Sequence, residues 1–149
     1  MAISAVAGGG AIVSTPVRNQ EQPPDHFVCR DGMEFAGTHL IFDVWDAKRL
    51  DDVAYMRDVM VRAVEECGAT LLHIHLHHFT PTGISGVAVL AESHISVHTW
   101  PERGFAAFDV FMCGDAKPEL AGPIFQQAFS AGQLDVKTIH RGLVPGPGE

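Results

Sequence analysis

The stretch VAVLAESHISVHTW, residues 87–100, contains two strand-like runs joined by a very short connection. The first run, VAVLAE, is apolar, and the second, HISVHTW, alternates apolar and polar side chains. We expect Ile95 and Val97 to face inward, with Ser96 and His98 on the opposite side, because a period of two is typical of a half-buried strand. A short connection between neighbouring strands favours antiparallel pairing.

Four more runs in the chain fit strands. They are THLIFDVW (38–45), ATLLHIHLHHF (69–79), FAAFDVFMC (105–113) and LDVKTIHR (134–141). In the second of these, the alternation predicts that Leu72, Ile74 and Leu76 share one face. The segment TPTGISG (80–86), which precedes VAVLAE, is expected to be a turn-rich loop.

Two further segments fit helices. Residues 49–67 carry apolar side chains at three- and four-residue steps, and Gly68 follows where a left-handed cap is expected. Residues 118–131 form a second predicted helix, with Pro118 near its first turn. The order strand, helix, several strands, helix, strand predicts an α+β fold. We expect a two-layer sandwich with a mostly antiparallel sheet and two main helices on one face.

The chain divides into three parts by composition. Residues 1–33 are predicted to be a flexible N-terminal extension, because a glycine cluster and the turn-rich RNQEQPPD (18–25) show no period. Residues 34–142 form the predicted domain, and residues 143–149 a tail. The apolar start of the chain lacks a basic region, so we do not interpret it as a signal peptide.

Charge and cysteine content narrow the class of protein. The net charge of -8 argues against binding to nucleic acid or to an anionic membrane. No apolar run approaches the ~20 residues of a membrane span. The cysteines Cys29, Cys67 and Cys113 include no CxxC pair, so we expect a reducing compartment, the cytoplasm.

The histidines His73, His75 and His77 alternate along one predicted strand and raise the question of a zinc site. Alternate side chains on a strand are about 7 Å apart, which is awkward for three ligands of one tetrahedral ion. We therefore expect no metal. The three alternating histidines are better explained as part of a polar sheet face, or of a face covered by a partner subunit.

The residues around Ser93, in the segment AESHISVHTW (91–100), allow several interpretations of this serine. A serine hydrolase would place its nucleophile in Gly-x-Ser-x-Gly, and that pattern is absent around Ser93. The zinc-binding pattern His-Glu-x-x-His is absent as well. The spacing of Ser93 and His98 alone indicates ordinary polar residues at a strand junction. Cys113, considered by itself, is best explained as a small buried side chain.

The longer segment PTGISGVAVLAESHISVHTWPERGFAAFDVFMCGD, residues 81–115, resembles the bacterial and archaeal S-adenosylmethionine decarboxylases. Those enzymes carry Gly-Val-Ser-Gly, then Ser-Glu-Ser-His, then Ile-His-Thr-Trp-Pro-Glu, then Asp-x-Phe-Thr-Cys-Gly. The likeness extends over about residues 37–142. It implies a pyruvoyl-dependent carboxy-lyase that supplies the aminopropyl donor for spermidine synthesis.

The resemblance gives the quoted serine a specific role. Ser93 is implied to be the precursor of a self-generated pyruvoyl group, after a cut between Glu92 and Ser93. Ser85 and His98 are implied to support this processing, and Cys113 to donate a proton to the substrate. Phe79 and Trp100 are implied to contact the adenine, and Glu102 the ribose hydroxyls.

The resemblance also implies a homodimer of cleaved αβ units, with each active site drawing on both subunits. Several residues depart from the family pattern: His78 replaces an arginine, Phe105 a tyrosine and Met112 a threonine. These departures lie beside the expected pocket and keep open a pyruvoyl-dependent decarboxylase of ornithine or arginine. A third alternative is an unprocessed, non-catalytic paralogue, which the presence of all the processing residues argues against.

Overall fold

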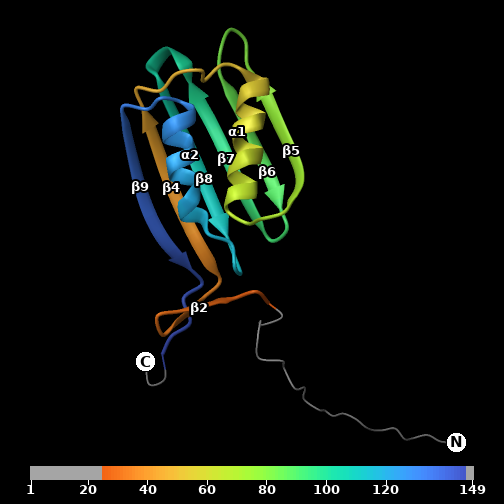
Figure 1. Ribbon diagram of the computed structural model, residues 1–149, viewed down its shortest axis with the longest axis vertical. Coiled ribbons are helices and arrows are strands. Elements are labelled where there is room, and N and C mark those ends of the chain that lie inside the picture. Colours follow the sequence, from red (N-terminus) through yellow and green to blue (C-terminus); the bar gives the residue numbers. More distant parts are fainter. Residues whose placement is uncertain (1–24, 147–149) are drawn as a thin grey trace, which may run out of the picture.

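Two helices lie on one face of a six-stranded sheet, in a computed structural model that describes residues 25–146 (Figure 1). The sheet strands are β4 (Gly37–Trp45), β5 (Leu71–His78), β6 (Ile84–Leu90), β7 (Ser93–Trp100), β8 (Phe105–Met112) and β9 (Gln133–Arg141). The helices are α1 (Val53–Glu66) and α2 (Ala121–Ala128), with short 3₁₀ turns η3 (Pro101–Arg103) and η4 (Pro118–Leu120). The predicted α+β sandwich is confirmed.

The strand order is β5-β6-β7-β8-β4-β9, and every neighbouring pair is antiparallel. Strand β4 from the first half of the chain therefore lies between β8 and β9 from the second half. Strands β6 and β7 are adjacent, as their short connection predicted, and Leu90 pairs with Ser93 across the turn.

The hydrophobic core lies between the sheet and the helices. Alternation along β7 and β8 buries one face of each strand, including Ile95, Val97 and Phe108. Phe108 stacks on Phe125 of α2 with ring centroids 4.0 Å apart. Helix α1 buries its apolar stripe against the same layer, so burial of apolar surface holds both helices on this face.

Helix α1 begins four residues later than the sequence predicted. The Asp52 side chain accepts the Tyr55 backbone N–H at 3.0 Å, which satisfies a donor that the first turn leaves unpaired. The preceding residues are thereby freed to form a loop, and that loop contacts the site described below. At the other end, Gly68 has a φ of 77°, as expected for a left-handed cap.

Two details of the predicted hairpin region were wrong. A register shift between Leu71 and His73 places Leu71, with Ile74 and Leu76, toward the core, and leaves Leu72 64% exposed. A bulge of this kind reverses the facing of the residues before it, which alternation cannot anticipate. Strand β6 begins at Ile84, so the end of the predicted TPTGISG loop belongs to the strand.

The region upstream of the sheet contains a hairpin that the sequence did not predict. It pairs β2 (Val28–Arg30) with β3 (Met33–Phe35) and spans the predicted end of the N-terminal extension. Phe35 is fully buried and stacks on His140 of β9, with ring centroids 4.3 Å apart. The rest of the predicted extension, residues 1–24, lies outside the described residues.

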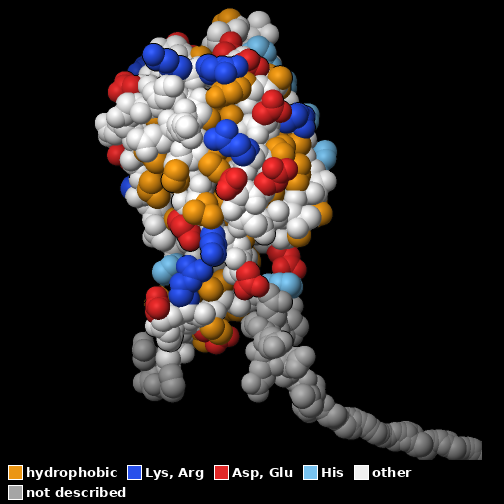
Figure 2. All heavy atoms as spheres, in the orientation of Figure 1, with side chains coloured by type: hydrophobic (Ala, Val, Ile, Leu, Met, Phe, Trp, Pro, Cys, Tyr) orange, Lys and Arg blue, Asp and Glu red, His pale blue; other side chains and the backbone are white. Residues whose placement is uncertain are grey.

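The two faces of the sheet differ in what covers them. Figure 2 shows the helix-covered side, where acidic and basic side chains are interspersed with apolar ones. No described segment covers the opposite face, which we call the open face. Strand register and alternation assign to it the histidines His39, His73, His75, His77, His94 and His98. None of the described helices is long and apolar enough to cross a membrane.

Candidate active site

The turn between β6 and β7 has an unusual backbone conformation. It consists of Ala91 and Glu92, and Glu92 has a φ of 66°. The left-handed region costs a residue with a Cβ about 1 kcal/mol or more, so surrounding contacts must hold it there. One such contact is a hydrogen bond of 2.9 Å from the Ala91 N–H to the Thr70 carbonyl oxygen.

Ser93 and Cys113 are brought together at this turn. The Ser93 Oγ accepts a hydrogen bond of 3.2 Å from the Cys113 backbone N–H, because β7 and β8 are paired neighbours. Both residues line a cavity of about 370 Å³. The other lining residues are His26, Gly68, Ala69, Thr70, Ala91, Glu92, Gly114, Asp115 and Ala116. The structure therefore assembles three predicted residues, Glu92, Ser93 and Cys113, around one cavity.

The Cys113 thiol is in an environment that favours its protonated form. Burial raises its pKa above the ordinary value, and the nearby Glu92 carboxylate raises it further. A thiol with a raised pKa keeps its proton at neutral pH and can act as an acid.

A second set of predicted residues lies on the open face. The ring of His98 stacks on Trp100 with centroids 4.2 Å apart, and Phe79 lies parallel to His98 at 6.2 Å. Ser85 is directly opposite His98 in the β6–β7 pairing. Ser85 therefore sits within a strand, whereas the sequence placed it in a loop.

One chain does not bring the two sets together. Ser93 and His98 are five positions apart on β7, which corresponds to roughly 16 Å along a strand. Ser93 also alternates with the buried Ile95 and Val97, whereas His98 points to the open face.

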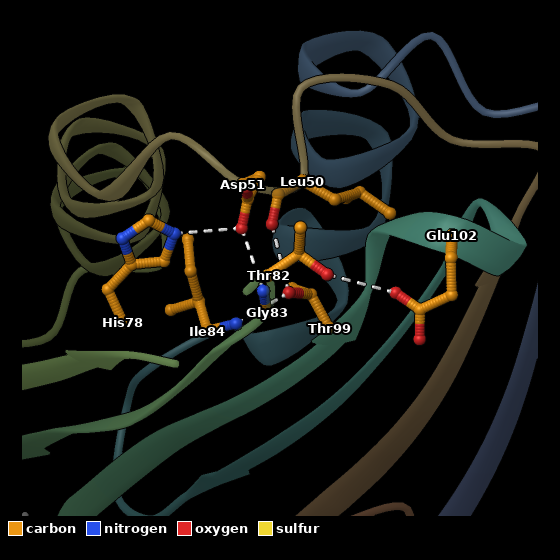
Figure 3. Close-up of polar contacts among 8 residues, drawn as sticks. All are labelled: Leu50, Asp51, His78, Thr82, Gly83, Ile84, Thr99 and Glu102. Carbon is orange, nitrogen blue, oxygen red and sulfur yellow. Dashed lines mark hydrogen bonds and ion pairs between the residues drawn. The ribbon is translucent and has the colours of Figure 1, made fainter. Parts of the chain in front are cut away.

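Glu102 is linked to the turn between β5 and β6 (Figure 3). In this close-up, the Thr82 hydroxyl donates to Glu102 Oε2 at 3.3 Å. Asp51 Oδ1 accepts the Gly83 N–H at 2.7 Å and lies 2.9 Å from His78 Nε2. The Gly83 N–H, and secondly His78, hold the pKa of the Asp51 carboxyl below its ordinary value.

Thr99 is the buried member of this group. Its hydroxyl donates to the Leu50 carbonyl oxygen and accepts the Ile84 N–H, each at 2.9 Å. Thr99 thus joins the loop before α1 to the start of β6. Sequence reasoning missed Asp51, Thr82 and Thr99, and the only available signal was a polar residue at an inward position of the alternating strand β7.

The open face carries a polar network that the sequence did not suggest. Asp109 accepts from the Ser96 hydroxyl at 3.0 Å, and its other oxygen lies 3.1 Å from His39 Nε2. Arg141 Nη1 approaches His39 Nδ1 at 3.3 Å. Burial lowers the pKa of the neighbouring His94, and the charge of His39 adds to the effect. Among residues 25–146, no group of three or more histidine, cysteine or acidic residues is arranged to hold a metal ion.

Known proteins resemble this chain in both sequence and fold. The family model described as S-adenosylmethionine decarboxylase matches residues 38–142. An S-adenosylmethionine decarboxylase proenzyme from Methanococcus maripaludis strain S2 is 44% identical over 115 residues, which are 75% of this chain and 94% of that protein. A proenzyme of the same name from Syntrophomonas wolfei is 41% identical over 120 residues, or 78% of this chain and 95% of that protein.

The fold agrees with a solved structure. The adenosylmethionine decarboxylase from Aquifex aeolicus VF5 superposes with a TM-score of 0.70 at 32% sequence identity, covering 77% of this chain and 98% of that one. The family match spans every predicted site residue from Phe79 to Cys113. With the shared fold and the cavity at Ser93, these matches show that the chain belongs to the S-adenosylmethionine decarboxylase family.

Proposed function

We propose that this chain is the precursor of a pyruvoyl-dependent S-adenosylmethionine decarboxylase that cuts itself between Glu92 and Ser93. The observation that carries the proposal is the Ser93 hydroxyl, held by the Cys113 N–H at the edge of a cavity and next to a left-handed Glu92. The relatives reported above are named for S-adenosylmethionine, which favours this substrate over ornithine or arginine. The placement of Glu92, Ser93 and Cys113 around one cavity argues against a non-catalytic paralogue.

The processing chemistry uses the hydroxyl of Ser93 twice. Its Oγ attacks the Glu92 carbonyl carbon, the peptide C–N bond breaks, and an ester joins the two residues while the nitrogen gains a proton. Loss of the Ser93 Cα proton then expels the Glu92 carboxylate and cuts the chain. The remaining enamine tautomerises, and water releases ammonia to leave a ketone at the start of the second fragment.

The residues around Ser93 fit such a group. A pyruvoyl ketone in the active enzyme supplies an electron sink for decarboxylation. Cys113 lies beside the group's precursor, and its raised pKa keeps a proton on the thiol. We assign it the return of a proton to the substrate carbon that has lost carbon dioxide.

The nucleoside part of the substrate is assigned to the other set of residues. Phe79 and Trp100 offer aromatic surfaces next to His98, and the Glu102 carboxylate can accept hydrogen bonds from ribose hydroxyls. Phe79 is 42% exposed, so its ring has surface available for an adenine.

We further propose that the enzyme is a homodimer, in which a second copy of the chain covers the open face. A single chain keeps His98 and Ser85 far from Ser93 and on the opposite face, so each site is incomplete without residues of the partner subunit. Exposed aromatic side chains on the open face, such as Trp45 and Phe79, support a protein partner there.

The three cysteines are all unpaired, which supports a reducing compartment such as the cytoplasm. The net charge of -8 argues against nucleic acid as a further partner.

The decisive experiment is an intact-mass measurement of the purified, reduced chain. We expect two fragments that meet at Glu92 and Ser93, with the second blocked at its amino end. Ser93→Ala must remain a single 16.1 kDa species, while the matched control Ser96→Ala on the same strand is cut. The processed enzyme should release carbon dioxide from S-adenosylmethionine and not from ornithine or arginine. A persistently uncut wild-type chain would refute the proposal.

A further inference from the structure

We propose that His26 is a positioning residue for self-cleavage and that it acts by holding the side chain of Glu92. His26 lies upstream of residues 38–142, the part of the chain that the family model matches. This inference rests on the proposed cut between Glu92 and Ser93. It assigns a role to a segment that the family match does not cover.

Two contacts fix His26 at the proposed cut. Its Nε2 lies 3.1 Å from Glu92 Oε1, and its backbone carbonyl oxygen accepts the Gly114 N–H at 3.1 Å. Glu92 directly precedes Ser93, and Gly114 directly follows Cys113. His26 therefore bridges the two segments whose own hydrogen bond, from the Cys113 N–H to the Ser93 Oγ, places the attacking oxygen.

The contact acts on the residue whose conformation matters most for the first step. The φ and ψ of Glu92 set the direction of the carbonyl that Ser93 Oγ attacks, and its φ of 66° is one that side-chain-bearing residues rarely adopt. A tether on the Glu92 side chain excludes turn conformations in which the carbonyl points elsewhere. Orientation of reacting groups is a recognised source of rate.

The electrostatics suit the same role. Among the described residues that line the cavity, His26 is the only basic one. The Glu92 carboxylate contributes to the raised pKa of Cys113, and both residues line the cavity. The His26 and Glu92 side chains are 40% and 52% exposed, which limits the strength of the pair to that of a surface contact.

The role belongs mainly to the precursor. After the cut, Glu92 ends the first fragment, and its carbonyl takes no further part in the reaction. Loss of His26 should therefore slow cleavage more than it slows turnover by enzyme that is already processed.

The test compares cleavage rates of full-length chains after dilution from denaturant, followed by intact mass. His26→Phe keeps an aromatic ring and loses the donor, and we expect cleavage to slow roughly two- to fivefold, as for loss of an exposed ion pair. His26→Gln keeps a side-chain N–H and should cleave at nearly the wild-type rate. The matched control His140→Phe, which keeps a ring against Phe35, should do the same.

A double-mutant cycle identifies the contact. In a Glu92→Gly background, where glycine adopts a positive φ freely, His26→Phe should have no further effect. Fully processed His26→Phe enzyme should lose a smaller factor in kcat than its precursor loses in cleavage rate.

Wild-type cleavage rates in His26→Phe would overturn this inference and leave the proposed function standing. A loss of kcat in the processed variant as large as the loss in cleavage rate would also overturn it, because His26 would then act equally in turnover. A wild-type chain that never cleaves would remove the proposed function first.

Discussion

Thr99→Val is predicted to weaken the fold by removing one buried hydroxyl. The Thr99 hydroxyl joins the Leu50 carbonyl oxygen to the Ile84 N–H, with both hydrogen bonds at 2.9 Å. Leu50 is 3% exposed and Ile84 is fully buried, so neither backbone group has easy access to water. Valine has nearly the same shape as threonine, so the substitution leaves the packing in place and removes only the hydrogen bonds.

The expected loss follows from those two backbone groups. A buried donor or acceptor left without a partner costs about 1–3 kcal/mol. Two such groups give a loss of about 2–6 kcal/mol in the free energy of unfolding. With a urea m-value of about 2 kcal/mol/M, the midpoint of unfolding should fall by about 1–3 M.

Urea unfolding should be measured in a Ser93→Ala background, which keeps the chain in one piece and the transition reversible. All variants must be compared at one protein concentration, because the stability of the proposed dimer would depend on concentration. Thr138→Val, at an exposed position on β9, is the matched control and should leave the midpoint within ~0.3 M of the parent. A Thr99→Val midpoint equally close to the parent would refute the reasoning, because it would mean that water satisfies both groups.

Three more predictions concern the substrate, the thiol acid and pH. Thr82→Val should raise the KM for S-adenosylmethionine about threefold with little change in kcat, because Glu102 loses the hydroxyl that orients it. Thr138→Val is the control in the same carbon dioxide assay, and an equal rise in its KM would contradict this prediction. Cys113→Ala should reduce turnover much more than cleavage, measured by carbon dioxide release and intact mass, and equal losses would remove the assigned proton transfer. Burial, then Glu119 and Glu66, raise the pKa of Cys67 from 9.0 to about 11. The contribution of the protonated Cys67 thiol to the free energy of unfolding is therefore complete below about pH 9. It is lost as the pH rises toward 11, because the thiol of the unfolded chain releases its proton at a lower pH than that of the folded chain. Cys67→Ala should flatten that decline in urea midpoints between about pH 8 and pH 10.5, and an unchanged decline would assign it to other groups.

Local patterns were enough to predict most of the fold. Alternation and short apolar runs located all six sheet strands, and the three- and four-residue spacing located α1, because burial of one or both faces imposes those patterns. The ends were less accurate, since Asp52 delays α1 through a side-chain cap. The bulge near Leu72 and the hairpin of β2 and β3 were missed because register shifts and isolated short strands leave no periodic signal.

The candidate site was also predicted only in part. The resemblance named Ser93, Cys113 and His98, and the structure places two of the three around one cavity. Strand alternation places His98 on the opposite face of the sheet from Ser93, and the five positions between them place it further along β7. The sequence motif alone does not show this separation in space. Contacts such as His26 with Glu92 join segments far apart in the chain, so no local pattern could reveal them.

The position of β4 between β8 and β9 has a consequence for how long a mature molecule survives. If the chain is cut as proposed at the turn after β6, strands of the two fragments are interleaved within one sheet, and the fragments can separate only if the hydrogen bonds between their strands break. The folded molecule therefore stays together with no covalent link. Full unfolding, however, releases two separate polypeptides that must meet again before they can refold. Each molecule has in effect one opportunity to fold as a single chain, and its working lifetime is then set by its rate of unfolding.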